Sequence, residues 1–172
     1  IMSNGMMESV KRLYLDSHSR TSVLLAKVLC DELWNVKPEY IHLDDYSLAD
    51  NPADGDAFVL IGDKVFDYEG RFTHTYDLAE CWQGMTGLPF VFAVWIARND
   101  VPAEFIGKLD ESLRYGTQHI REAIDYYGHS GKPYAFDYLT NNIDFVFDDQ
   151  KRKALHLFWE KGQKFDPREN PG

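Results

Sequence analysis

Cysteine and long hydrophobic runs are both scarce in this chain of 172 residues, whose only cysteines are Cys30 and Cys81. Both lie in apolar patterns, so one disulfide is compatible with the sequence, but two buried free thiols in a reducing cytoplasm are favoured. No apolar stretch approaches the roughly 18 residues of a membrane span. The first residues lack the basic and apolar regions of a signal peptide. We therefore expect a cytoplasmic protein with no membrane partner.

Positive charge is also scarce: 18 basic against 28 acidic residues give a net charge of −10. Phosphate binding needs clustered positive charge, so this balance argues against a nucleic-acid partner. The 6 histidines are scattered without metal-ligand spacing, and no metal is expected. No glycine-rich dinucleotide or phosphate loop is present, so no cofactor is expected either. A content of 44% hydrophobic and 15% aromatic residues indicates a folded protein.

Strand and helix patterns alternate through the first half of the chain. Such alternation predicts an α/β fold with a mainly parallel sheet. Residues 57–61 form a continuous apolar run, which is typical of a strand buried on both faces. Periodicity and turn residues predict strands at 11–16, 38–44, 57–61 and 71–77, helices at 21–34 and 78–85 (the second capped by Asp77), and a helical turn at 47–50.

The second half is predicted to be helical. Apolar residues at spacings of three and four predict one long helix over 104–127. Shorter helices are predicted over 133–142 and over 148–164, the last with Asp148 as its cap, and residues 128–132 as a loop between them. The very apolar stretch 90–97 is a strand or an extended crossover. The expected organisation is an α/β region at 8–97, a helical region at 98–166 and a tail at 167–172.

The segment 16–22, which we call the hydroxyl-rich turn, joins the first long strand to the first long helix. A strand that turns directly into a helix leaves the first N–H groups of the helix free, and these groups and the helix dipole favour an anion. The N–H and hydroxyl groups of Thr21 and Ser22, with Ser19 and the Arg20 guanidinium, are candidate donors to a carboxylate or phosphate. The alternative is that Ser19 is an ordinary helix N-cap and Arg20 a solvated charge.

A second candidate segment, Gly62-Asp63, also follows a predicted strand. Ligands of such sheets sit at the carboxyl ends of strands, so this pair and the hydroxyl-rich turn could face one cleft. The alternative for Gly62 and Asp63 is a simple turn. His18 could act as an acid or base near neutral pH, or merely decorate the loop. Phe90 is the aromatic residue best placed to face a cleft, because it follows the break at residues 87–89.

Four segments, taken in order, resemble the chorismate dehydratases of the futalosine route to menaquinone. They are 15–22 with its Ser-Arg-Thr-Ser tetrad, 60–63 (Leu-Ile-Gly-Asp), 76–82 (Tyr-Asp-Leu-Ala-Glu-Cys-Trp) and 86–95 (Thr-Gly-Leu-Pro-Phe-Val-Phe-Ala-Val-Trp). The resemblance covers about residues 8–166. It implies a lobe like those of type II periplasmic binding proteins, in a cytoplasmic lyase that dehydrates chorismate to 3-(1-carboxyvinyloxy)benzoate. It also implies a small anionic substrate near Ser19, Arg20, Thr21, Ser22, Gly62, Asp63 and Phe90.

The resemblance does not extend to the family's first lobe. The Asn and Ser proposed as catalytic in the family belong to that lobe, so no residue here is assigned a catalytic role. A two-lobed binder clamps its substrate between lobes and excludes water only with both. We therefore expect this chain alone to be inactive, and either to self-associate through the apolar surface that the first lobe would cover or to need that lobe in trans. The segment around Phe90 would be the hinge to that lobe.

Two alternatives remain at this point. The first is a solute-binding or sensor module for a small carboxylate, with no catalysis. The second is the sister activity of the same pathway, 1,4-dihydroxy-6-naphthoate synthase, whose sequences look less similar around the hydroxyl-rich turn.

Overall fold

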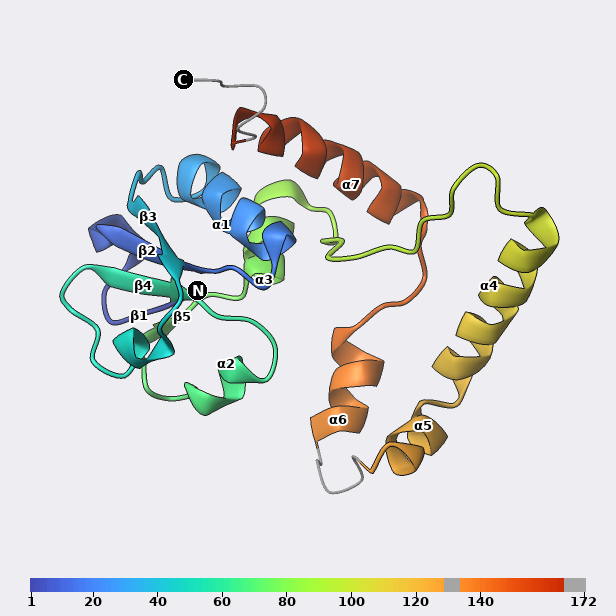
Figure 1. Cartoon of the computed structure of the whole chain (residues 1–172). Coiled ribbons are helices and arrows are strands. Elements are labelled where there is room, and N and C mark those ends of the chain that lie inside the picture. The colour runs from blue at the N-terminus through green and yellow to red at the C-terminus, as the bar shows by residue number, and fades with distance from the viewer. Residues whose placement is uncertain (129–133, 166–172) are drawn as a thin grey trace. The chain divides into compact units, whose positions relative to one another are not determined.

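The structure is a computed structural model, and it describes residues 1–128 and 134–165. The chain divides into two compact units (Figure 1). One, which we call the sheet unit, comprises Ile1–Phe92 together with the chain from Asp149 onward, and the other, the helical unit, comprises Ala93–Asp148. The domain boundaries expected from the sequence stay a prediction, and the expected tail at 167–172 lies outside the described residues.

The sheet unit is built on five strands in the order β3-β2-β4-β1-β5. The α/β class is therefore confirmed, but the expectation of a mainly parallel sheet was wrong. The pairs β2–β3 and β2–β4 are parallel, whereas β1 pairs antiparallel with both β4 and β5, so the sheet is mixed. The strands are β1 (Met2–Ser3), β2 (Arg12–Asp16), β3 (Glu39–Leu43), β4 (Asp56–Val59) and β5 (His74–Thr75).

Strand β1 is what makes the sheet mixed. Met2 pairs with Phe58 on one side and with Thr75 on the other, so β1 is inserted between β4 and β5. Both of its residues are buried. Two residues are too few to show a period, and for that reason the sequence pattern gave no sign of this strand. The predicted strand at 71–77 is reduced to β5 because Arg71 closes a turn on Tyr68.

Helix α1 (Arg20–Glu32) and helix α3 (Leu78–Thr86) form where the sequence predicts them. Asp77 caps α3 as predicted, because its carboxylate accepts the N–H groups of Ala79 and Glu80 at 2.8 and 2.9 Å. Gly87 ends α3 in the left-handed region with φ of 72°, which glycine adopts without strain. The short elements of this unit are η1 (Met7–Ser9), η2 (Tyr46–Ala49) and α2 (Lys64–Asp67).

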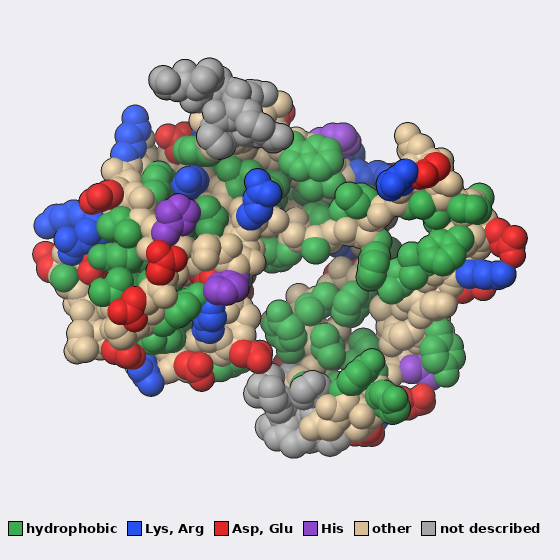
Figure 2. Space-filling model, in the orientation of Figure 1, with side chains coloured by type: hydrophobic (Ala, Val, Ile, Leu, Met, Phe, Trp, Pro, Cys, Tyr) green, Lys and Arg blue, Asp and Glu red, His purple; other side chains and the backbone are tan. Residues whose placement is uncertain are grey.

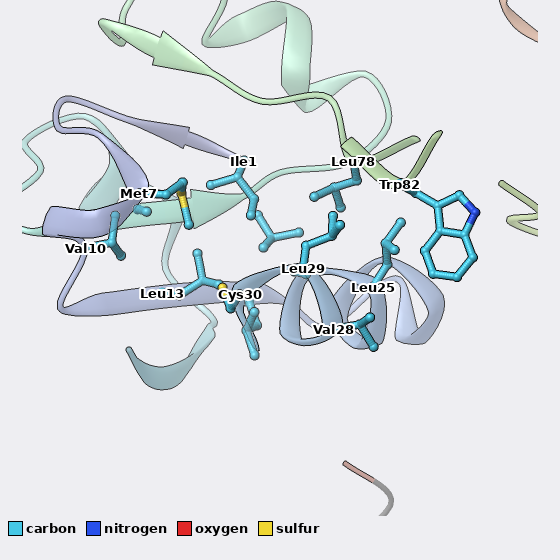
Figure 3. Close-up of a cluster of buried hydrophobic side chains, with 14 of the residues drawn as sticks. Ile1, Met7, Val10, Leu13, Leu25, Val28, Leu29, Cys30, Leu78 and Trp82 are labelled. Carbon is cyan, nitrogen blue, oxygen red and sulfur yellow. The ribbon is translucent and has the colours of Figure 1, made fainter. Parts of the chain in front are cut away.

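The alternation of side chains along β2 and β4 divides the core between the two faces of the sheet. Leu13 and Val59 are buried on the face that α1 and α3 cover, with Leu25, Leu29 and Trp82 from those helices (Figure 3). Phe58 points to the other face, where it packs with residues of η2 and of the chain after α2. Two clusters of buried side chains, one on each face, therefore hold the strand ends in place.

Helix α7 (Asp149–Gly162) belongs to the sheet unit although it lies far along the chain, and η4 (Gln163–Phe165) follows it. It packs on α1 (Figure 1): Phe158 is buried in the same core as Trp82, and a Cβ on Gly162 would lie 2.9 Å from Leu24 Cδ2. Lys161 also forms an ion pair with Glu32 at 2.5 Å. The predicted helix at 148–164 is confirmed.

The helical unit contains α4 (Ala103–Gln118), α5 (Ile120–Tyr126), α6 (Tyr134–Asp137) and a π-helical turn, η3 (Tyr138–Asn142). The single helix expected over 104–127 was wrong, because it breaks at His119, whose φ and ψ are −121° and 36°. Gly116 and Thr117, both weak helix formers, precede that break. Of the predicted loop at 128–132, only Gly128 lies within the described residues. The helix predicted over 133–142 corresponds to α6 and η3, and its expected first residue, Pro133, lies outside the described residues.

The apolar stretch 90–97 forms neither helix nor strand, so the strand interpretation of it was wrong. Across the parts of the chain that the structure describes, none of the helices combines the length and the apolar character needed to cross a bilayer.

Candidate functional site

Three polar side chains meet at the carboxyl ends of the three neighbouring parallel strands β3, β2 and β4. Asp16 is the last residue of β2, Tyr46 opens η2 after β3, and Lys64 opens α2 after β4. Lys64 Nζ donates to Asp16 Oδ2 at 3.0 Å and also to the Tyr46 hydroxyl. This is the edge of an α/β sheet at which ligands bind. We call Asp16, His18, Tyr46 and Lys64 the strand-end cluster.

Asp16 is the buried centre of the cluster, with none of its side chain exposed. Its Oδ1 accepts the backbone N–H of His18 at 3.0 Å and lies 2.8 Å from His18 Nδ1. Its Oδ2 is the atom that Lys64 contacts. A buried carboxylate costs free energy unless it is paired and hydrogen-bonded, and here several donors meet that need.

The electrostatics of the cluster favour an ionised pair. Burial raises the pKa of Asp16, but hydrogen bonds from the backbone and ring of His18, from Lys64 and from Tyr46 outweigh it and bring the pKa to about 2. Partial burial lowers the pKa of Lys64, but its hydrogen bonds to Tyr46 and Asp16 prevail and raise that pKa above its usual value. The Lys64 ammonium also lies 3.9 Å from the centroid of the Tyr46 ring.

The hydroxyl-rich turn runs from Asp16 directly into α1. Ser19 is the N-cap: its Oγ accepts the N–H of Ser22 at 3.1 Å and donates to Ser22 Oγ at 2.9 Å. The capping interpretation of Ser19 is therefore confirmed, and the hydroxyl of Ser22, a buried residue, is used within the turn. These two hydroxyls stabilise the turn rather than point freely into solvent.

Donors nevertheless remain at the start of α1. The first two backbone N–H groups, of Arg20 and Thr21, have no acceptor among the described residues, as expected for the first turn of a helix. The Thr21 side chain is half-buried and the Arg20 side chain is exposed. Binding of an anion by Arg20, Thr21 and Ser22 stays a prediction.

Gly62 and Asp63 lie between β4 and α2, immediately before Lys64. Gly62 has a φ of 64°, and a Cβ there would meet nothing within 4 Å. Glycine therefore suits this position because it adopts the left-handed backbone conformation without strain, and not because a side chain would clash. Asp63 is exposed, and its carboxylate does not cap α2. The structure brings this turn to the strand-end cluster through Lys64, and a direct role for Gly62 or Asp63 stays a prediction.

Phe90 lies in an aromatic group of the sheet unit. Its ring centroid is 5.5 Å from that of Trp82, 5.0 Å from that of Phe158 and 4.7 Å from that of Phe92. The ring is half-buried against the core that contains α3 and α7. The described contacts of Phe90 are with these aromatic residues and not with the strand-end cluster, and its binding role stays a prediction.

Sequence reasoning named His18 only as an accessory, gave Asp16 no role beyond the first position of the hydroxyl-rich turn, and did not name Tyr46 or Lys64. One signal was available, because Asp16 ends a buried strand and His18 follows two residues later, within reach of its carboxylate. The partnership with Lys64 spans 48 residues and depends on the sheet order, which no local pattern shows.

The family model for menaquinone biosynthesis matches residues 2–164. The chain therefore belongs to the menaquinone-biosynthesis family, and the resemblance seen in its sequence is confirmed. Among curated proteins it is similar to the chorismate dehydratase of Thermus thermophilus, with 29% identity over 144 residues. That match covers 73% of this chain and 52% of the relative, so the chain spans about half the length of the curated relative.

Proposed function

We propose that the sheet unit is a substrate-binding lobe of a cytoplasmic chorismate dehydratase, built like a lobe of a type II periplasmic binding protein. The reaction removes water from chorismate and gives 3-(1-carboxyvinyloxy)benzoate, a carbon–oxygen lyase step. The similarity to a dehydratase of that name supports the reaction. The observation that carries the proposal is that the start of α1 follows directly from Asp16, which pairs with Lys64, at one edge of the sheet.

The chemistry of chorismate fits that edge. Chorismate carries two carboxylates, and the start of a helix of 13 residues offers unpaired N–H groups and a favourable dipole to one of them. The Thr21 hydroxyl and the Arg20 guanidinium can add charge-assisted hydrogen bonds. The whole chain has a net charge of −10, so a dianion needs such a local set of donors.

Catalysis by the whole enzyme needs more than this lobe. A dehydration site must exclude water, which in a two-lobed protein requires both lobes. We therefore propose that the 172-residue chain binds the substrate weakly and does not turn it over alone. By analogy with the two-lobed proteins that the chain resembles, we also propose that the segment around Phe90 is the hinge to the other lobe.

The binding test uses the protein expressed from its complete reading frame and 3-hydroxybenzoate or chorismate as the titrant. Thr21→Val removes one hydroxyl and keeps the shape of the side chain. We expect the affinity to fall about tenfold or more, because a hydrogen bond to a charged group contributes about 1.5–3 kcal/mol. Ser17→Ala, an exposed change in the same turn, is the matched control and should leave affinity unchanged. An unaltered affinity in Thr21→Val would contradict the carboxylate assignment.

Mass spectrometry of the same protein, incubated with chorismate or with the cyclic futalosine-derived substrate, separates the remaining interpretations. Formation of the dehydrated product supports the lyase. Tight binding without product supports a carboxylate-binding or sensor module. Turnover only of the cyclic futalosine-derived substrate supports 1,4-dihydroxy-6-naphthoate synthase.

A further inference from the structure

Asp16 places a buried negative charge close to the start of α1. Its Oδ1 accepts the backbone N–H of His18 at 3.0 Å, and the backbone N–H of Arg20, two residues further on, is the first of the helix. Two residues of extended chain span about 7 Å at most, so the Asp16 carboxylate lies within about 10 Å of that N–H group. This distance is about one Debye length at 0.1 M salt. An uncompensated carboxylate there would repel the anion that the helix start attracts.

Other carboxylates at the same edge of the sheet face water. Asp44 and Asp45 follow β3 directly, Asp63 lies between β4 and α2, and all three are exposed. Water screens the charge of an exposed carboxylate, whereas none of the Asp16 side chain is exposed. Of these four carboxylates, Asp16 is therefore the one whose charge most needs a partner within the protein.

Lys64 brings a positive charge directly to Asp16. Its Nζ lies 3.0 Å from Asp16 Oδ2, and 34% of the Lys64 side chain is exposed. The Tyr46 hydroxyl accepts a second hydrogen bond from the same ammonium group, which also lies 3.9 Å from the centroid of the Tyr46 ring. The backbone N–H of His18, by contrast, gives Asp16 a hydrogen bond but no net charge. Lys64 thus neutralises the carboxylate, and Tyr46 holds the ammonium in place.

Stability alone explains this pair less well. A buried ion pair is often no more stabilising than apolar side chains of the same volume. Asp16 has a local use, because the bond from its Oδ1 to the N–H two residues later closes the turn that leads into α1. A carboxylate in that place brings a negative charge to the entrance of an anion site, and Lys64 offsets it from a strand end 48 residues away.

We propose that Lys64 sets the specificity of the start of α1 for anions by compensating the charge of Asp16, an inference that rests on the proposed function. Lys64 is a positioning residue in this account, because it acts on the substrate carboxylate through Asp16 and not by contact. A unit charge about 10 Å away, at an effective dielectric constant of about 20, changes the affinity for an anion about tenfold.

The test titrates the protein expressed from its complete reading frame with 3-hydroxybenzoate. Lys64→Met removes the ammonium and keeps an unbranched side chain, and we expect Kd to rise about tenfold. Asp16→Asn keeps the Oδ1 acceptor and leaves the charge of Lys64 uncompensated, so this variant should bind more tightly than wild type. Lys161→Met, which removes the ammonium paired with Glu32 in the same unit, is the matched control and should leave Kd within about twofold.

The sign of the Asp16→Asn effect separates charge compensation from a purely scaffolding pair. A scaffolding pair loses affinity when either partner is removed, so unchanged or weaker binding by Asp16→Asn overturns the proposal. That titration decides the matter even if Lys64→Met does not fold.

The double variant Asp16→Asn/Lys64→Met tests whether Lys64 acts through Asp16. It should bind more tightly than Lys64→Met alone, because no uncompensated carboxylate remains. A double variant that binds no better than Lys64→Met shows direct contact between Lys64 and the ligand, and overturns the proposal. If wild type and Lys64→Met bind 3-hydroxybenzoate equally well, only this inference fails. If wild type does not bind it, the proposed function fails, and the inference with it.

Discussion

The two units of the chain differ in what their apolar side chains contact. The sheet unit buries Trp82 completely, with Phe158 and Phe90 packed edge-on against it. In the helical unit none of the described residues is buried, and hydrophobic side chains lie exposed along α4 to α6 (Figure 2). One unit thus has a core of its own and the other has amphipathic helices without one. A precise site requires a rigid scaffold, and only the sheet unit provides it.

The largest expected effect comes from removing one tryptophan from each unit of this chain. Trp82→Ala leaves a cavity in the core and should lower the free energy of unfolding by about 3–5 kcal/mol. Trp95→Ala, at a side chain that is 75% exposed in the helical unit, should change it by less than about 0.5 kcal/mol. Urea unfolding of both variants measures the two values. Equal losses would show that the two units do not differ in this way.

The strand-end cluster predicts a pH dependence that belongs to the sheet unit. The pKa of Asp16 lies at about 2 in the folded chain against 3.8 for the free group, so its pairing stabilises the fold above about pH 4. That contribution, about 2 kcal/mol, is lost as the pH falls through the folded pKa. The difference in unfolding free energy between wild type and Asp16→Asn should therefore shrink from about pH 6 to about pH 2. Asp54→Asn, the same substitution at a fully exposed carboxylate, is the matched control and should change the free energy of unfolding by less than about 0.5 kcal/mol.

The exposed apolar side chains of the helical unit predict weak self-association. Ile96 is 88% exposed and is followed by further exposed apolar residues on α4. We expect sedimentation velocity to show reversible association of wild type that Ile96→Asp reduces. Leu48→Asp, at an exposed leucine of the sheet unit, is the control and should leave association unchanged. A wild-type chain that stays monomeric at high concentration would rule this surface out.

The smallest expected effect distinguishes ion pairs in the two units. Lys161 pairs with Glu32 across α7 and α1, and each of the two side chains is 25% exposed. Lys108 pairs with Glu104 one turn away on α4, with both side chains exposed. Lys161→Ala should cost about 1 kcal/mol of unfolding free energy, and Lys108→Ala about 0.3 kcal/mol. Double-mutant cycles with the partner residues measure both, and a larger coupling for Lys108 would reverse the expected order.

The sequence allowed prediction of the parts of the fold that have a clear period and a cap. Helix α3 is the clearest case, since Asp77 at its start and Gly87 at its end are both local signals. Strand β1 could not be predicted, because its place between β4 and β5 is set by pairing with distant residues. The break at His119 was missed because the apolar spacing of α4 and α5 continues through it.

The candidate site was predicted in part, for similar reasons. The hydroxyl-rich turn could be found because a strand, a cap residue and a helix follow one another locally, and Ser19 does cap α1. The pairing of Asp16 with Lys64 could not be predicted, because an aspartate that is buried and paired looks the same in the sequence as an exposed one. Only the parallel register of β2 with β4 brings Lys64 to it.

The most direct test of the account is an NMR titration of the labelled 172-residue chain with 3-hydroxybenzoate. If the sheet unit holds the site, amide shifts should concentrate at residues 16–22 and around Tyr46 and Lys64, with the helical unit unchanged. Thr21→Val should weaken those shifts and leave the rest of the spectrum intact. Shifts confined to the helical unit, or none at millimolar ligand, would contradict a carboxylate site at the ends of β3, β2 and β4.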